Sequence, residues 1–305
     1  SIGLKMALWV DKYRPNSFEK MTLHEGLNSR IKKLAASGDL PHLMFCGPSG
    51  AGKKTRILAL LRELYGSSVE KVKVQQKTFQ FTEPKVTLDI TILYSNNHIE
   101  LTPADAGNRD SLVVQSVIKE MAASVPITDN ISNKRTFKVI VLNEVERLSR
   151  NAQHALRRTM EKSTLGCRII LSSTSSTKII EPLRSRCLVM RVPAPTKEEI
   201  VSILSDISKK QGIVLPPPLA YSIADNSNRN LRKAVLSLEA TKVAQYPFVM
   251  GQKVCKADWE VFIGKIAGEI LREQTPQKLA EIRGKLYELL SHCIPAEVII
   301  TQLTL

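Results

Sequence analysis

The residues best suited to chemistry lie in one glycine-rich loop, which reads Gly47-Pro48-Ser49-Gly50-Ala51-Gly52-Lys53-Lys54-Thr55. Its three glycines allow the backbone amides to turn inward, so that these amides and the N-terminus of a following helix face a β-phosphate. Lys53 stands where a lysine reaches the β- and γ-phosphate oxygens of a nucleotide. The whole loop, from Gly47 to Thr55, is therefore predicted to bind a nucleotide.

The segments on either side of the loop are those that such a loop requires. Residues 42–46 form an apolar run typical of a buried strand, and the leucines of residues 56–64 recur at helical spacing. A second apolar run, residues 137–142, contains several β-branched side chains and predicts another buried strand. Strand, glycine loop and helix in this order favour a nucleotide site over a chance glycine turn.

Two positions depart from the pattern of nucleotide-hydrolysing proteins. Lys54 stands where Ser or Thr normally holds Mg²⁺, and Thr55 comes one residue late. The second strand ends in Asn143-Glu144 instead of Asp-Glu, and a neutral amide oxygen binds a hard cation more weakly than a carboxylate does. Mg²⁺ binding, with Thr55 as a weak ligand, is thus predicted to be impaired. Glu144 is a candidate for the carboxylate that orients the attacking water, and a solvated carboxylate at a strand end is the alternative.

Positive charge is unevenly distributed along the 305-residue chain, which has a formal net charge of +15 and a pI near 9.6. Residues 131–191 contain 13 Lys and Arg, four Glu and no Asp, and so carry +9. Such a concentration favours a polyanionic partner, and nucleic acid phosphate is the usual one. A subunit interface that uses arginines to meet a neighbour's nucleotide is the alternative, and charge does not separate the two.

Several classes of site and location are disfavoured by the sequence. The five cysteines are too scattered for a C-x-x-C pair and the five histidines form no H-E-x-x-H motif, so neither a zinc site nor a disulfide framework is indicated. No apolar run approaches the length of a membrane-spanning helix, and residues 1–10 are too short for a secretory signal. We expect a reducing intracellular compartment and no membrane partner.

Five motifs follow one another along the chain: Trp9-Val10-Asp11-Lys12-Tyr13-Arg14-Pro15, the glycine loop, Asn143-Glu144, Ala155-Leu156-Arg157-Arg158-Thr159-Met160-Glu161 and Ser185-Arg186-Cys187. In order and spacing they resemble the motifs of replication factor C small subunits, which are sliding-clamp loader proteins of the AAA+ class. The Gly-Lys-Lys-Thr loop, the Asn-Glu ending and the stretches at 245–248 and 292–295 are most similar to the eukaryotic subunit-3 type. The resemblance covers nearly the whole chain.

The resemblance implies an α/β fold with three parts. These are an AAA+ P-loop domain with a parallel sheet (residues 1–195), a small helical lid domain (196–245) and the start of a helical collar (246–305). The residues agree with the first boundary, because Pro195 interrupts the pattern and Thr196 to Glu199 has the sequence of a capping box. The helical pattern stops at Leu305 where the family adds further helices, so the collar is predicted to be truncated and its assembly is left open.

The resemblance also implies nucleotide contacts outside the loop. Val10, Tyr13 and Arg14 would pack over the adenine, since apolar and aromatic surface suits the face of a base; simple coverage of the core is an equal alternative for Tyr13. Thr174 falls at the sensor-1 position, where asparagine is common, and its hydroxyl can still bond water or phosphate. Arg232 falls at sensor 2, which leans onto the γ-phosphate, whereas an ordinary arginine at a helix N-terminus is unfavourable.

Two further roles for arginines follow from the resemblance. Arg186 looks like the arginine finger, which stabilises the charge developing on ATP bound to the adjacent subunit. Arg150, Arg157 and Arg158 fall largely off the apolar face of a predicted helix that begins near residue 150. On that helix the resemblance implies contacts with the DNA backbone. For any single arginine, a solvated or interface role is an equal alternative.

The leading hypothesis is a subunit of a nuclear, hetero-pentameric, ATP-dependent clamp loader that places a sliding clamp on primer-template DNA in replication and repair. Its own site is expected to bind ATP or ADP and to hydrolyse weakly or not at all, while Arg186 acts in trans. The alternatives are an autonomous AAA+ ATPase such as a helicase loader or remodeller, a scaffold with a vestigial loop, and a P-loop kinase. Lys54 and Asn143 weigh against the first, the intact glycines and Lys53 against the second, and the motif around Arg186 against the third.

Overall fold

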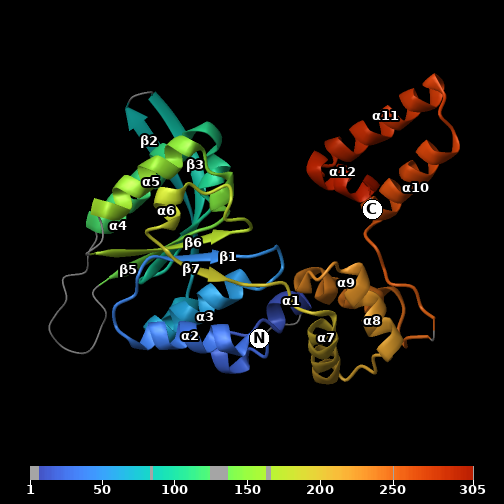
Figure 1. Cartoon of the computed structure of the whole chain (residues 1–305), viewed down its shortest axis with the longest axis horizontal. Coiled ribbons are helices and arrows are strands. Elements are labelled where there is room, and N and C mark those ends of the chain that lie inside the picture. The colour runs from blue at the N-terminus through green and yellow to red at the C-terminus, as the bar shows by residue number, and fades with distance from the viewer. Residues whose placement is uncertain (1–6, 83–84, 124–136, 163–165, 250, 305) are drawn as a thin grey trace. The chain divides into compact units, whose positions relative to one another are not determined.

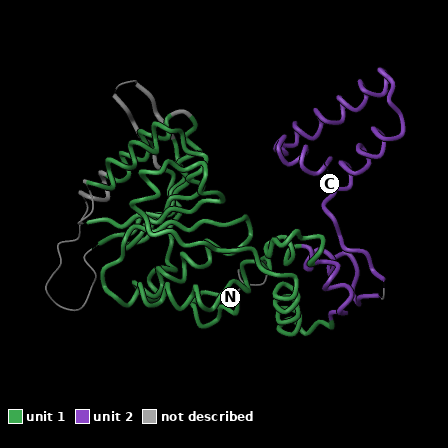
Figure 2. Tube along the Cα trace, viewed as in Figure 1, with its two compact units in different colours: residues 1–214, 224–236 green, residues 215–223, 237–305 purple. Residues whose placement is uncertain are grey.

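The computed structural model describes residues 7–82, 85–123, 137–162, 166–249 and 251–304 (Figure 1). The chain divides into two compact units (Figure 2). The first unit comprises Ser1–Val214 and Ala224–Leu236, and the second comprises Leu215–Ile223 and Ser237–Leu305.

A seven-stranded sheet forms the centre of the first unit, with the strand order β2-β3-β4-β5-β6-β1-β7 (Figure 1). The strands are β1 (Leu43–Cys46), β2 (Lys73–Thr82), β3 (Lys85–Tyr94), β4 (His98–Leu101), β5 (Lys138–Leu142), β6 (Cys167–Ser173) and β7 (Leu188–Arg191). The five strands from β4 to β7 in the sheet order are parallel, whereas β2 pairs with β3 and β3 with β4 in antiparallel fashion. The two apolar runs predicted to form buried strands are β1 and β5. The antiparallel hairpin of β2 and β3 extends the expected parallel sheet at one edge.

Helices cover both faces of this sheet, because its central strands are apolar on both sides. On one face, side chains of β1, β5 and β6 pack with α4 (Asp110–Ala123) and α5 (Arg150–Lys162). On the other face, the alternate side chains of the same strands pack with α2 (Glu25–Ala36) and α3 (Lys53–Tyr65). The first unit is thus a helix–sheet–helix sandwich, and the predicted α/β class is confirmed.

The first helix after the last strand begins where the sequence predicts a capping box. In the capping box of α7 (Lys197–Gln211), the Glu199 amide donates to Thr196 Oγ1 over 3.2 Å and the Thr196 amide donates to Glu199 Oε2 over 2.7 Å. The next helices are α8 (Pro217–Asn226) and α9 (Leu231–Ala244).

The shorter helical segments are α1 (Trp9–Lys12), α6 (Glu181–Arg184), η1 (Phe18–Lys20), η2 (Gly66–Glu70), η3 (Pro103–Arg109) and η4 (Val145–Arg147). The start of α7 is as predicted, while the domain boundaries at 195 and 245 stay predictions.

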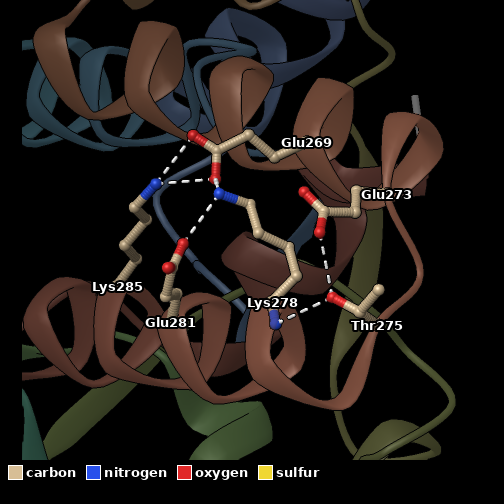
Figure 3. A network of polar contacts seen from close by, with 6 residues as sticks. All are labelled: Glu269, Glu273, Thr275, Lys278, Glu281 and Lys285. Atoms are coloured by element: carbon tan, nitrogen blue, oxygen red, sulfur yellow. Dashed lines mark hydrogen bonds and ion pairs between the residues drawn. The ribbon is translucent and has the colours of Figure 1, made fainter.

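The second unit contains α10 (Asp258–Arg272), α11 (Pro276–Ser291) and α12 (Ala296–Thr304). They enclose a small core of Ile263, Ile266, Ile282, Leu289 and Ile299. Ion pairs also join α10 to α11 (Figure 3): the Glu269 carboxylate lies 3.1 Å from Lys278 Nζ and 2.6 Å from Lys285 Nζ. None of the described helices combines the length and the apolar composition that a bilayer crossing requires.

His42, directly before β1, predicts a dependence of stability on pH. Burial lowers the pKa of His42 to about 4, and the neighbouring Arg168 cation contributes to this effect. The neutral ring accepts a hydrogen bond at Nδ1 from the Ile169 amide of β6 over 3.0 Å, and protonation removes that acceptor. Between pH 6.5 and 4 the unfolded chain therefore binds more protons than the folded chain, so acid destabilises the fold.

We expect the free energy of unfolding to fall by about 2 kcal/mol as pH drops from 6.5 to 4, after allowing for the partial exposure of the ring. Urea melts at a series of pH values measure this effect. His42→Asn should flatten the slope, because its amide oxygen can accept the Ile169 hydrogen bond without titrating, and His292→Asn, at an exposed position, should not. Equal slopes for wild type and His42→Asn would contradict this assignment.

Candidate nucleotide-binding site

The glycine loop connects β1 to α3, as its sequence predicts, and backbone contacts fix its path. The Gly47 amide donates to the Ser173 carbonyl at the end of β6 over 3.2 Å, and the Ala51 amide donates to the Pro48 carbonyl over 3.3 Å. Gly52 immediately precedes α3. Its φ of +87° is a left-handed conformation that residues with a side chain rarely adopt. The first turn of α3, whose amides have no carbonyl of the helix to bond, therefore begins at Lys53.

The loop is wedged between neighbouring backbone and side-chain atoms. A Cβ at Gly47 would lie 2.0 Å from the Val192 carbonyl oxygen, just after β7. A Cβ at Gly50, which has φ +75°, would lie 1.8 Å from Asn230 Oδ1. Asn230 caps α9, because this same oxygen accepts a hydrogen bond from the Lys233 amide over 3.1 Å. The contact between the loop and the start of α9 has no signature in the local sequence.

Lys53 lies over the loop. Its Nζ donates to the Gly47 carbonyl over 2.6 Å and to the Pro48 carbonyl over 3.0 Å. Burial lowers the pKa of the Lys53 ammonium; the Glu146 carboxylate opposes this effect and the Arg232 cation adds to it. An ammonium that is partly desolvated and flanked by free helix amides is well placed to attract a phosphate group.

A cavity of about 980 Å³ opens beside this loop. It is lined by helix residues of α7 and α9, by the carboxyl ends of β5 and β6, and by predicted nucleotide contacts, namely Val10, Tyr13, Arg14, Ser49, Gly50, Ala51, Gly52, Lys53, Lys54, Thr55, Thr174 and Arg232. Gly47 and Pro48 are not among the lining residues, and their carbonyls accept hydrogen bonds from Lys53. The structure thus brings the predicted residues to one place, and their roles toward a ligand stay predictions.

A carboxylate that the sequence reasoning missed lies in this cavity. Glu146 Oε1 accepts from the Thr174 hydroxyl over 2.7 Å and from the Thr174 amide over 3.2 Å. Burial acts to raise the pKa of Glu146, but these hydrogen bonds outweigh it and the pKa is lowered. Glu144 also lines the cavity; it has φ 52°, and its carboxylate lies 2.8 Å from the Arg147 guanidinium. The sequence could have indicated Glu146, because it is the second acidic residue after Asn143 and more than one side chain after a strand end can face the site.

The two unusual positions of the sequence converge on one oxygen atom. Lys54 Nζ lies 2.5 Å from Glu100 Oε1, and Asn143 Nδ2 donates to that same atom over 2.8 Å. Glu100 is on β4, the strand adjacent to β5, and only 6 % of its surface is exposed. In the described chain, His, Cys, Asp and Glu side chains form no group of three or more that could hold a metal ion. An ammonium and an amide N–H thus meet at the Glu100 carboxylate.

Relatives of known family share about half of this sequence. The chain is 51 % identical over 298 residues to replication factor C subunit 3 of Arabidopsis thaliana, covering 97 % of this chain and 84 % of that protein. It is 50 % identical over 294 residues to replication factor C subunit 3 of Homo sapiens, covering 96 % and 82 %. The chain belongs to the replication factor C small-subunit family.

Family models match three parts of the chain, and a solved structure has a similar fold. Residues 259–305 match the C-terminal domain of replication factor C subunit 3, residues 202–243 match an RCF1/5-like AAA+ ATPase lid domain, and residues 23–196 match the DNA polymerase III delta subunit. The Holliday junction branch migration motor RuvB of Thermotoga maritima has a similar fold, with a TM-score of 0.57 and 17 % identity over 86 % of this chain and 81 % of that one. The AAA+ fold with a lid and a C-terminal helical part is therefore confirmed.

The arginines with predicted roles in this replication factor C family member lie on α5 and directly after α6. Arg186 follows α6; its guanidinium donates to the Pro182 carbonyl over 2.8 Å and to Glu161 Oε1 over 2.5 Å. Arg157 Nε lies 4.0 Å from the same Glu161 oxygen. Arg150 and Arg158 are exposed on α5, and Arg186 is not among the residues that line the cavity. The roles of these arginines toward DNA and toward a neighbour's nucleotide stay predictions.

Proposed function

We propose that this chain is a subunit of a nuclear, hetero-pentameric clamp loader that uses ATP to place a sliding clamp on primer-template DNA. One observation carries the proposal. In a chain half identical to replication factor C subunit 3, the glycine loop, the N-terminal segment and Arg232 line the same cavity of about 980 Å³. We further propose the division into an AAA+ domain (1–195), a lid (196–245) and a collar segment (246–305).

In this proposal the cavity binds ATP or ADP. The free amides from Gly52 to Thr55, at the start of α3, and the ammonium of Lys53 bind the phosphates, since free amides at a helix N-terminus favour anions. Val10, Tyr13 and Arg14 cover the base, and Arg232 approaches the terminal phosphate from α9. The Tyr13 hydroxyl is hydrogen-bonded to Gln211 at the end of α7, which connects the base-covering segment to a lid helix.

We propose that this site hydrolyses its nucleotide weakly or not at all. Lys54 and Asn143 stand where metal-binding oxygens are expected, and both are engaged with Glu100. Glu146, rather than Glu144, is the carboxylate held at the sensor-1 threonine. Isothermal titration with ADP and ATP, followed by single-turnover hydrolysis, tests the site: binding without turnover is expected, fast turnover would indicate an autonomous ATPase, and absence of binding would indicate a scaffold.

We propose that α5 faces DNA. Arg150, Arg157 and Arg158 belong to a segment with a net charge of +9, and phosphate contacts from such residues position a protein on DNA without reading the bases.

Arg186 is proposed to act on ATP bound to the adjacent subunit. In the fully assembled loader, Arg186→Ala should lower hydrolysis at that one neighbouring site by about a hundredfold or more, because the guanidinium stabilises transition-state charge. The amplitude of the fast phase in single-turnover hydrolysis by the complex measures this loss. Arg184→Ala, two residues away, is the matched control and should keep the full amplitude.

The Glu161 carboxylate provides a second variant for this test. Glu161→Gln weakens the ion pair that holds Arg186 and should leave the finger functional. If the Arg186→Ala complex assembles and hydrolyses with full amplitude, the role in trans is wrong.

A further inference from the structure

We propose that the Lys54 ammonium serves as the cation of the nucleotide site, so that this chain binds ADP or ATP equally well without a divalent metal. The proposal rests on the nucleotide site described above. It gives Lys54, which replaces the expected hydroxyl residue, a function in nucleotide binding beyond the loss of a Mg²⁺ ligand.

The position of Lys54 is fixed by groups from two strands. Its Nζ lies 2.5 Å from Glu100 Oε1 on β4, and Asn143 at the end of β5 donates to the same oxygen over 2.8 Å. The backbone N–H of Asn143 donates to the Leu101 carbonyl over 3.0 Å, and this bond keeps β4 and β5 in register at this point. The three residues therefore form one unit, here called the Lys54–Glu100–Asn143 cluster.

Because Glu100 is buried, its carboxylate depends on Lys54 and Asn143 as partners. The Glu100 side chain is 8 % exposed, and a buried carboxylate is stable only with a cation or several hydrogen-bond donors. The Lys54 side chain is 41 % exposed and lines the cavity, whereas Glu100 does not line it. Glu100 thus holds the ammonium from behind, and the remaining N–H donors of Lys54 are available on the cavity side.

The cluster also opposes a divalent cation. Mg²⁺ needs oxygen ligands in near-octahedral geometry, and here an ammonium and an amide stand where a hydroxyl and a carboxylate would supply them. The Lys54 ammonium also occupies the Glu100 carboxylate, so this oxygen is already engaged by a cation of the chain itself. Lys53 and Lys54, the first two residues of α3, both line the cavity and offer ammonium N–H donors to a nucleotide polyphosphate.

Isothermal titration of the full chain with ADP, in excess Mg²⁺ and in EDTA, tests the proposal without using hydrolysis. We expect the wild-type dissociation constant to differ by less than about twofold between the two conditions, because the cation belongs to the chain. The paired variant Lys54→Thr/Glu100→Gln removes both charges together and restores a hydroxyl. In EDTA it should bind ADP about tenfold or more weakly, which is the typical effect of one lost charge-assisted contact, and Mg²⁺ should recover part of the loss.

Two further variants keep the outcome interpretable. Lys54→Arg retains the cation and should remain insensitive to EDTA, while Lys33→Thr removes an exposed lysine outside the cavity and should behave as wild type. Wild-type binding that requires Mg²⁺ would overturn this inference alone. A wild type that binds ADP in neither condition would overturn the nucleotide site itself, and a folded Lys54→Thr/Glu100→Gln variant with wild-type affinity in EDTA would show that Lys54 is not the cation.

Discussion

Gly47→Ala is expected to abolish nucleotide binding and to destabilise the fold by about 3 kcal/mol or more, because the added methyl group has no room. Its Cβ would lie 2.0 Å from the Val192 carbonyl oxygen and 3.0 Å from the Val192 carbonyl carbon. Both atoms belong to the backbone, so a side-chain rotation cannot relieve the overlap. The Val192 amide also donates to the Cys46 carbonyl over 2.8 Å, and the Gly47 amide is bound to Ser173, so movement on either side breaks a strand contact.

Urea denaturation and titration with ADP measure the two effects of Gly47→Ala. Gly26→Ala in α2 is the matched control, because nothing lies within 4 Å of a Cβ at Gly26. It should leave the free energy of unfolding unchanged or raise it by a few tenths of a kcal/mol, since alanine is the better helix former. A Gly47→Ala protein with wild-type stability and affinity would show that the loop can shift away from β7.

Lys53→Ala is expected to weaken ADP binding by about a hundredfold while leaving the stability of the free protein unchanged or slightly higher. The loss of affinity corresponds to about 3 kcal/mol, the upper range for hydrogen bonds to a charged group. Stability should not suffer, because burial lowers the pKa of Lys53 and the folded state therefore bears a cost for keeping this ammonium charged. The Lys53 ammonium donates to two loop carbonyls, those of Gly47 and Pro48.

Titration calorimetry and thermal melts of the same sample separate binding from stability for Lys53→Ala. Lys33→Ala, on the exposed side of α2, controls for the loss of one positive charge. A large drop in melting temperature together with the loss of binding would mean that Lys53 mainly holds the loop, and wild-type affinity would remove it from the phosphate site.

Features that depend on neighbours along the chain could be read from the sequence. Apolar runs predict β1 and β5, glycine spacing predicts the turn into α3, and the Thr196 to Glu199 pattern predicts the cap of α7. These features are local, because strand burial, left-handed glycines and helix caps are set within a few residues. The antiparallel hairpin of β2 and β3 was not predicted.

Burial of the C-terminal helices could be predicted only in part. Ile263, Ile266 and Ile282 are buried in the core of the second unit, as their helical spacing suggests. Leu271 on α10 and Leu279 on α11 are apolar too, yet they are 80 % and 69 % exposed in the described chain. Helical periodicity shows which residues share a face, but the position of the neighbouring helix decides how much of that face is covered.

By itself, the sequence determined the family motifs, the α/β class and the two anomalies at Lys54 and Asn143. Only the tertiary structure decided what those anomalies contact, because Glu100 comes from a strand distant in sequence that the sheet order places beside β5. The same holds for the contacts of Glu146 with Thr174 and of Arg186 with Glu161. Residue types limit which charges can pair, but strand order and helix packing fix the distances, and the Coulomb energy and desolvation of a buried pair depend on those distances.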